Sequence, residues 1–175
     1  MFLNKVTNLR EGYLKELGFK SHQQPITGVH NVIFTIASGT ILNVSSIENI
    51  GFMQEDLFID YVDIEWCIRA NSRGFKVLIN ADTIIEHSIG ESTISFLGNI
   101  YPDRSPIRMY FLIRNGINLS LYSKTLSFNQ KSVIFIKTIL YIYCYSSRGG
   151  EKINKIKCCL KGFYHGLINK MGNPL

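Results

Sequence analysis

The pattern of side chains changes near Pro106, and this change constrains the fold more than any other feature of the sequence. After this proline, apolar side chains recur at helical spacing in three long segments, at residues 107–122, 127–145 and 151–170. Proline is well tolerated in the first turn of a helix, so Pro106 suits the start of the first segment. The sequence therefore predicts three consecutive helices after Pro106, with the strands placed before it.

Charge divides the chain at nearly the same place. Residues 104–175 carry twelve basic side chains and one acidic side chain, Glu151, which sum to +11. Residues 1–103 carry seven basic and twelve acidic side chains, which sum to −5. This division argues against a uniformly basic protein that binds nucleic acid. We expect an α/β protein in two parts: an acidic part at 1–103 and a basic, aromatic-rich helical part at 104–175.

Short segments of both kinds fill the first part. Runs of β-branched and aromatic residues predict strands at 31–36, 41–44, 75–79 and 83–87. Helices are expected at 9–17, 45–50 and 61–72, and a loop rich in Gly, Asn and Pro at 90–106. Ser45 or Ser46 is the expected N-cap of the 45–50 helix, and Gly51 and Gly74 stand where the later two helices end.

Three acidic side chains cluster where the 61–72 helix is expected to begin. Asp60 is placed to cap it, and Asp63 follows three residues later in a pattern that resembles a capping box. Acidic residues at a helix start ordinarily cap it and favour the helix dipole. A carboxylate there also suits a general base that takes a proton from an incoming hydroxyl. Both interpretations stay open for these residues, and the ordinary expectation for Glu65 and Arg69 is a surface i,i+4 ion pair.

Several segments follow one another in a recognisable order. They are residues 37–40, 50–55, 57–70, 74–76, 86–91, 105–110 and 113–115, and the tail around Gly162, Gly166 and 170–172. The most specific is 57–70, which reads LFIDYVDIEWCIRA. In this order the segments resemble bacterial family-2 glycosyltransferases, and among them the rhamnosyltransferases that build surface polysaccharide. The resemblance covers residues 32–172.

The resemblance implies a GT-A fold, in which a nucleotide-sugar-binding half precedes an acceptor-binding half, and it matches this chain to the C-terminal half. Asp63 matches the residue that deprotonates the acceptor hydroxyl, and Glu65 matches the second acidic position of that motif. The implied reaction is transfer of L-rhamnose from dTDP-rhamnose to a lipid-linked glycan, with inversion, in O-antigen biosynthesis. Another sugar, such as galactofuranose, is the nearest alternative.

The same resemblance implies the other site residues. Ser38 and Gly39 match a segment that lines the acceptor side of the cleft, and His87 matches a late histidine that completes a Mg²⁺ or Mn²⁺ site in some relatives. The further candidates for acceptor or substrate binding are Asp60, Glu65, Trp66, Arg69 and Arg108. Arg108, Arg114 and Asn115 have an alternative role, which is to pair with the acidic first part across a domain contact.

Two features of that family are missing from the sequence. The Asp-x-Asp motif that holds the metal occurs nowhere, and too few residues precede Val32 to build a nucleotide site. We therefore expect a truncated or split enzyme that is inactive alone, with an upstream N-terminal half as a possible partner. A non-catalytic remnant or a membrane-associating module is the alternative from a different class.

The basic helices leave three interpretations. On an anionic membrane, each Lys or Arg near the surface contributes ~1 kcal/mol. The apolar run at 133–145 falls short of the ~20 residues that span a bilayer, but it suits an interface or a cover over the catalytic part. A solvated helical surface is the second interpretation, and nucleic acid, which we do not expect as a partner, is the third.

The start of the chain lacks an apolar leader and none of the four cysteines forms a C-x-x-C, so we expect a cytoplasmic protein, peripheral at the inner face of the plasma membrane.

Overall fold

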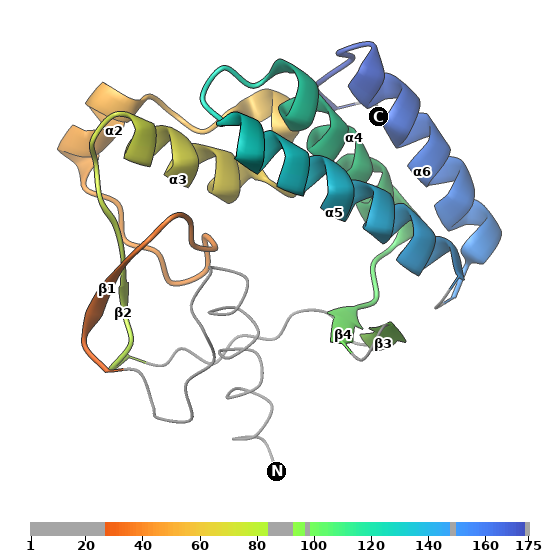
Figure 1. Cartoon of the computed structure of the whole chain (residues 1–175), viewed down its shortest axis with the longest axis horizontal. Helices are drawn as coiled ribbons and strands as arrows, with labels where there is room; N and C mark the ends of the chain where they lie inside the picture. The colour runs from red at the N-terminus through yellow and green to blue at the C-terminus, as the bar shows by residue number, and fades with distance from the viewer. Residues whose placement is uncertain (1–26, 84–92, 97–98, 148–149, 174–175) are drawn as a thin grey trace.

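The computed structural model describes residues 27–83, 93–96, 99–147 and 150–173, and it contains a small α/β part followed by three long helices (Figure 1). The elements of the α/β part are β1 (Val29–Val32), α2 (Val44–Ile50), the short 3-10 helix η1 (Glu55–Leu57), α3 (Val62–Ser72), β2 (Val77–Asn80), β3 (Thr93–Phe96) and β4 (Asn99–Pro102). The long helices are α4 (Pro106–Tyr122), α5 (Phe128–Ser147) and α6 (Lys152–Leu167). The α/β class and the three terminal helices are therefore confirmed.

The described strands form two antiparallel pairs. In the first pair β1 lies beside β2, with Val29 opposite Asn80 and Val32 opposite Val77. In the second pair β3 and β4 form a hairpin, with Thr93 opposite Pro102. The expectation of loop over 90–106 is wrong for this hairpin. Because β3 alternates polar Thr93 and Ser95 with Ile94, which is buried in the main core, it satisfies the ordinary strand pattern.

Two strand predictions differ from the structure. The strand expected at 31–36 pairs with β2 only as far as Val32, and the one expected at 41–44 does not form. Instead, the side chain of Asn43 accepts a hydrogen bond from the backbone N–H of Ser45 at 3.0 Å, so Asn43 rather than a serine caps α2. Asparagine is a strong N-cap residue, and this local bond favours helix over strand. The strand expected at 83–87 and the helix expected at 9–17 lie outside the described residues, apart from Thr83, which is in no strand.

Helix α3 ends as the sequence predicts. The backbone N–H of Gly74 donates to the carbonyl of Asn71, and that of Phe75 donates to the carbonyl of Ala70, each at 3.0 Å. This pair of bonds is a Schellman motif, which needs a left-handed residue at the C′ position. Gly74 supplies it with φ +83°, and Phe75 then packs into a small core with Ala70 and Val77.

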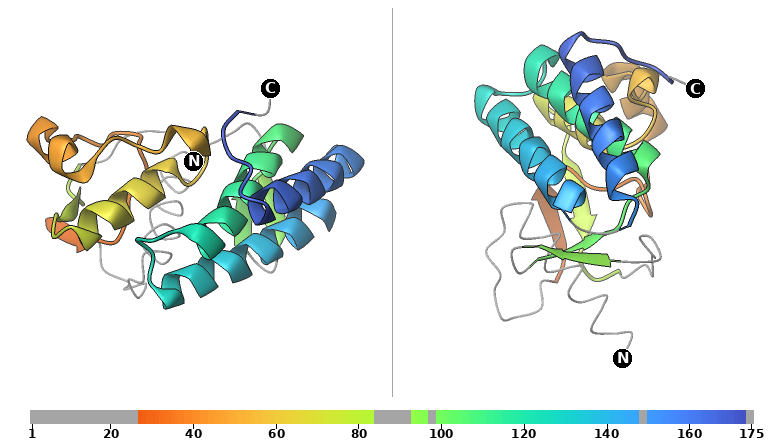
Figure 2. Two further views of the ribbon diagram at one scale, coloured as in Figure 1. Left: turned by 90° about the horizontal axis from the view of Figure 1, so that it is seen from above. Right: turned by 90° about the vertical axis from the view of Figure 1, so that its right-hand side faces the viewer.

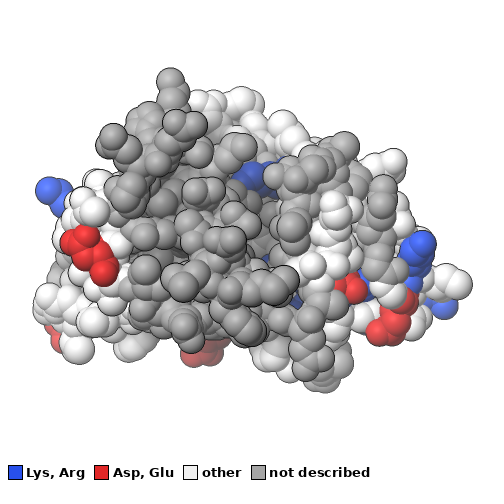
Figure 3. All heavy atoms as spheres, turned by 90° about the horizontal axis from the view of Figure 1, so that it is seen from below, with Lys and Arg blue, Asp and Glu red and all other residues white. Residues whose placement is uncertain are grey.

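Helix α4 lies at the centre of the helical part. It packs against both α5 and α6, and these two also touch each other (Figure 2). Buried side chains of α4 such as Met109, Ile113 and Ile117 share one core with Leu57 and Ile68 from the first part of the chain. The parts at 1–103 and 104–175, which differ in charge, are therefore joined by a common core. On the face seen from below, side chains of both signs stand at each end of the molecule (Figure 3).

Glycines let α6 approach α4 closely. A Cβ added at Gly162 would lie 2.5 Å from the carbonyl oxygen of Tyr110. A Cβ added at Gly166 would lie 2.7 Å from the carbonyl oxygen of Arg114 and 2.8 Å from the Cβ of Ile117. Because two of these neighbours are backbone atoms, they cannot turn away as a flexible side chain would.

Replacing Gly166 with alanine should therefore push α6 from α4 and lower the free energy of unfolding by about 1–3 kcal/mol, the usual cost of overpacking. Urea denaturation at constant slope measures the loss. The matched control is Gly150→Ala, since a Cβ at Gly150 meets no atom within 4 Å. Equal stability of the two variants would show that the helices do not pack this closely.

Candidate functional site

The segment that leads into α3 has an unusual backbone. Phe58, Asp60 and Tyr61 have φ angles of 62°, 60° and 68°, a region that non-glycine residues rarely adopt. Such conformations persist only where surrounding contacts impose them, and they cluster at functional sites. The contacts that impose them here come from α4.

Two neighbouring side chains of α4 hold this segment through its carbonyl groups. The amide of Asn115 donates to the carbonyls of Leu57, Ile59 and Asp60 at 2.8–2.9 Å. Arg114 donates to the carbonyls of Asp56, Leu57 and Gly172. Burial lowers the pKa of Arg114 from its usual value. Arg114 and Asn115 do contact the first part of the chain, but through carbonyls rather than through carboxylates.

Asp60 does not cap α3, contrary to the capping-box prediction. The N-cap position belongs to Tyr61, which makes no side-chain cap bond. The carboxylate of Asp60 instead accepts from Arg104 at 2.7 Å and from Arg108 at 2.9 Å, and its side chain is 8% exposed. The positive φ of Asp60 and Tyr61 interrupts the ordinary entry to a helix. Arg104, just before α4, and Arg108, in its first turn, offer the carboxylate stronger, charge-assisted bonds.

The pairing with Asp60 also involves Tyr145 of α5. Burial alone would lower the pKa of Arg104, but Asp60 and Tyr145 outweigh it, so that pKa is raised. Burial raises the pKa of Tyr145 to about 12, and its hydroxyl donates to the carbonyl of Pro102 at 2.9 Å. Arg104 therefore stays positively charged and Tyr145 stays neutral near pH 7. Arg104 and Arg108 carry two positive charges against the one negative charge of Asp60.

Asp63 lies in the first turn of α3 and is partly exposed. One of its carboxylate oxygens accepts from the backbone N–H of Ala37 at 3.0 Å, and the other accepts from the N–H of Ile64 at 2.9 Å. No ion pair to Asp63 forms among the described residues. The carboxylate is thus oriented by two backbone donors and keeps lone pairs for a further partner.

The bond from Ala37 is one of three that fasten an extended segment along α3. Asn71 donates to the carbonyl of Ile33 at 2.8 Å, and the thiol of Cys67 contacts the carbonyl of Thr35 at 3.9 Å. Residues four apart on a helix are ~6 Å apart along its axis, close to the ~6.6 Å between alternate residues of an extended chain. The two spacings therefore stay in step: along α3, positions 63, 67 and 71 each meet one alternate residue of the extended segment, at positions 37, 35 and 33 respectively. Burial raises the pKa of the Cys67 thiol, so this contact involves the neutral group.

This arrangement brings three of the predicted site residues together. Ser38 and Gly39 directly follow Ala37, whose N–H is bonded to Asp63, and both are exposed. Gly39 has φ +75°, which lets the chain turn away from α3 at this point. The expected acceptor-lining segment and the expected base therefore lie side by side.

Three other predicted site residues, Glu65, Trp66 and Arg69, are buried on the opposite flank of α3, where they support the 50–54 segment. Arg69 forms a two-pronged ion pair with Glu65 at 2.9 and 3.0 Å, and it also donates to the carbonyls of Ile50 and Phe52. The indole of Trp66 donates to the carbonyl of Gly51 at 2.8 Å. The i,i+4 pair expected at the surface does form, but it is buried, because the 50–54 segment covers it.

The remaining candidates do not gather around Asp63. Arg108 stands at the start of α4 and is 42% exposed beside Asp60. His87 lies outside the described residues. Within the described ranges, no group of three His, Cys, Asp or Glu side chains is placed to hold a metal ion. The described residues therefore do not fit a resident Mg²⁺ or Mn²⁺.

Sequence reasoning missed two contributors to this region. Arg104 carries the shorter of the two ion pairs to Asp60, yet it sits in a stretch expected to be loop. The backbone N–H of Ala37 orients Asp63, and a backbone donor has no signature in side-chain chemistry. For Arg104 the available signal is its spacing, since Arg104 and Arg108 flank the predicted helix start four residues apart.

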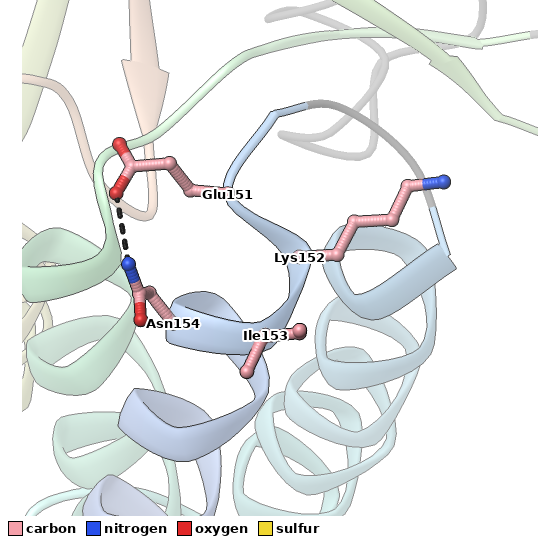
Figure 4. A pocket seen from close by; sticks show the side chains of 4 residues that line it. All are labelled: Glu151, Lys152, Ile153 and Asn154. Carbon is pink, nitrogen blue, oxygen red and sulfur yellow. Dashed lines mark hydrogen bonds between the residues drawn. The ribbon is translucent and has the colours of Figure 1, made fainter.

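A separate pocket lies at the start of α6 (Figure 4). Glu151, Lys152, Ile153 and Asn154 line it, and the amide of Asn154 donates to Glu151 at 3.2 Å. None of the predicted site residues lines this pocket, so it takes no part in the site around Asp63.

Comparison with known proteins gives one informative match. Over 85 residues the chain is 42% identical to dTDP-rhamnosyl transferase RfbF from Shigella flexneri. The matched stretch is 49% of this chain and 29% of the relative, so the chain spans less than a third of that relative's length. No protein-family model matches the chain, and no solved structure gives a significant match. The match relates a segment of this chain to a glycosyltransferase of the rhamnosyltransferase type.

Proposed function

We propose that this chain forms the acceptor side of a GT-A glycosyltransferase that moves L-rhamnose from dTDP-rhamnose to a lipid-linked glycan with inversion. The observation that carries the proposal is the geometry of Asp63. Its carboxylate is partly exposed, is oriented by the N–H of Ala37, and stands next to the exposed Ser38–Gly39 turn. The identity to RfbF over 85 residues supports the choice of rhamnose.

In this proposal Asp63 acts as the general base. Its carboxylate accepts the proton of an acceptor hydroxyl while that oxygen bonds to the anomeric carbon of the sugar. The bond from that carbon to the nucleoside diphosphate breaks, and the diphosphate leaves with the electron pair. Among the described residues no ion pair occupies Asp63, so a lone pair of its carboxylate is open to the acceptor hydroxyl.

In the proposed enzyme, the other predicted residues hold the segments around the start of α3 in place. Glu65, Arg69 and Trp66 fix the 50–54 segment against α3, which keeps the helix start in one place. Asp60 and Arg108 fix the strained turn before α3. Because the Arg108 side chain is 42% exposed, we assign its free guanidinium N–H groups to a phosphate of the acceptor or donor. We further propose a role in O-antigen synthesis at the inner face of the plasma membrane, where a lipid-linked acceptor would be found.

A segment exchange tests the proposal. The stretch of RfbF that matches this chain is replaced by residues 27–173 of this chain, which carry Asp63 wherever the 85 matched residues lie, and the chimera is assayed with radiolabelled dTDP-rhamnose and membranes from a strain that lacks RfbF. Label should enter the lipid fraction at a rate within about tenfold of RfbF, because the segment would supply an equivalent base.

The matched control is a chimera with the same stretch replaced by a Gly/Ser-rich linker, which should give no transfer. A chimera that folds, binds dTDP-rhamnose and transfers no label would contradict the proposal and favour a non-catalytic remnant. Transfer of a different sugar, such as galactofuranose, would correct the donor and keep the mechanism.

A further inference from the structure

Helix α6 is apolar on two opposite faces. Its inner face packs on α4 through buried residues such as Cys159, Gly162 and Gly166. Its outer face carries five large apolar side chains that are 39–71% exposed: Ile153, Ile156, Leu160, Tyr164 and Leu167. A single exposed apolar residue is ordinary, but an aligned set of five marks a surface that binds something.

The five side chains form one narrow stripe. At ~100° per residue they fall within an arc of about 80° on the helix surface, and they run almost from one end of α6 to the other. We call this set the outer stripe. Because α4 covers the other side of α6, the outer stripe is not needed for the core of the chain.

Lysines border the outer stripe on both sides. On the same helical wheel, Lys152 lies beyond one edge and Lys157 lies beyond the other, and both are exposed. The other two lysines of α6 are engaged on its packed side: the ammonium of Lys161 lies 5.8 Å from the ring centroid of Tyr110 on α4, and Lys155 is buried and paired with Asp103 at 2.5 Å. An apolar stripe with an exposed lysine at each edge suits a helix that lies in the plane of an anionic membrane.

Helix α5 provides an internal comparison. It also exposes apolar side chains, among them Val133, Ile136 and Leu140, so apolar exposure alone does not distinguish the two helices. Its lysines, however, Lys131 and Lys137, are half-buried and lie within about 60° of the buried residue Ile134, on the packed side. Of these two helices, only α6 has exposed lysines beside its exposed apolar side chains.

We propose that the outer stripe of α6 docks this chain onto an anionic lipid surface, with the stripe among the acyl chains and Lys152 and Lys157 at the headgroups. None of the helices in the described ranges is long and apolar enough to cross a membrane, so the docking is parallel to the surface. A second copy of the chain is a poorer occupant, because the lysines beside its stripe would face those of the first. The docking does not depend on sugar transfer.

Co-sedimentation with vesicles tests this docking on the full chain. The chain should bind vesicles of phosphatidylcholine with 30% phosphatidylserine, and binding should fall steeply at 1 M salt because the Debye length is then ~3 Å. The double variant Lys152→Gln/Lys157→Gln should bind about 30-fold more weakly, at ~5-fold for each lysine. The charge-matched control, Lys76→Gln/Lys124→Gln, removes two exposed lysines outside α6 and should bind normally.

A second pair of variants tests the stripe itself. Leu160→Ser should weaken binding to the same vesicles at least fivefold, whereas Leu140→Ser, its counterpart on α5, should change it less than twofold. Both residues are about half exposed or more, so both variants should keep the Tm of the parent chain. Equal loss from the two variants, or no binding to anionic vesicles, would overturn the proposal. Sedimentation velocity without lipid tests the alternative partner. A dimer that persists in Leu140→Ser but is lost in Leu160→Ser would show that the outer stripe binds a second copy of the chain instead of lipid.

Discussion

Replacing Asp63 with asparagine in the RfbF chimera should reduce rhamnosyl transfer by about 10²–10⁴-fold, the range that a positioned general base contributes. Asparagine has nearly the same shape, and its carbonyl oxygen still accepts one of the two backbone donors, from Ala37 or Ile64. It cannot take a proton at neutral pH. The expected signature is a large fall in kcat with little change in KM for dTDP-rhamnose or in Tm.

Two controls separate chemistry from structure. Asn71→Ala removes the bond to the carbonyl of Ile33, which fastens the same extended segment to α3 without touching Asp63. It should cost about 1 kcal/mol of stability and less than tenfold in transfer. Glu48→Gln removes an exposed carboxylate on α2 and should change neither. Equal losses of transfer in Asp63→Asn and Asn71→Ala would mean that Asp63 only anchors the segment.

Replacing Glu65 with alanine should lower the free energy of unfolding by about 3–5 kcal/mol, because it leaves the guanidinium of Arg69 buried without its countercharge. The side chain of Glu65 is 1% exposed and that of Arg69 is 10% exposed, so water cannot replace the lost partner at low cost. For a chain of this length the loss corresponds to about 6–20 °C in Tm. Urea denaturation measures it directly.

The variants Glu48→Ala and Glu65→Gln complete this test. Glu48→Ala removes an exposed carboxylate and should stay within about 0.5 kcal/mol of the parent. Glu65→Gln keeps an acceptor for Arg69 and should fall between the two. If Glu65 instead binds substrate directly, Glu65→Gln would raise KM at unchanged stability. That outcome would contradict the supporting role assigned to the Glu65–Arg69 pair.

The long helices could be predicted from sequence because their signals are local. Apolar spacing in 107–122, 127–145 and 151–170 reports α4, α5 and α6 to within a few residues at each end. Gly74 likewise predicts the end of α3, since a left-handed C′ residue depends only on its neighbours in sequence. The start of α3 is the contrasting case. Its three positive φ angles are imposed by Asn115 and Arg114, more than fifty residues away.

The same distinction applies to the candidate site. Residue types left Asp60, Asp63 and Glu65 as equal candidates, and only the resemblance singled out Asp63. The structure places the Ser38–Gly39 turn beside it, which no pattern in the sequence shows. The role of Asp60 could not be predicted, because its partners Arg104 and Arg108 reach it through the tertiary fold. The burial of the Glu65–Arg69 pair was also invisible in sequence, since nothing in the spacing shows that residues 50–54 cover it.

Chemical rescue of Asp63→Ala in the chimera tests the central claim most directly. Alanine leaves room where the carboxylate stood, so a small carboxylate in solution can act as the base in its place. We predict that formate restores transfer of radiolabelled rhamnose in proportion to its concentration, by at least tenfold, while chloride at equal ionic strength restores none. Full activity of Asp63→Ala without formate, or no rescue in a variant that keeps its Tm and its dTDP-rhamnose binding, would contradict the assignment of Asp63 as the base.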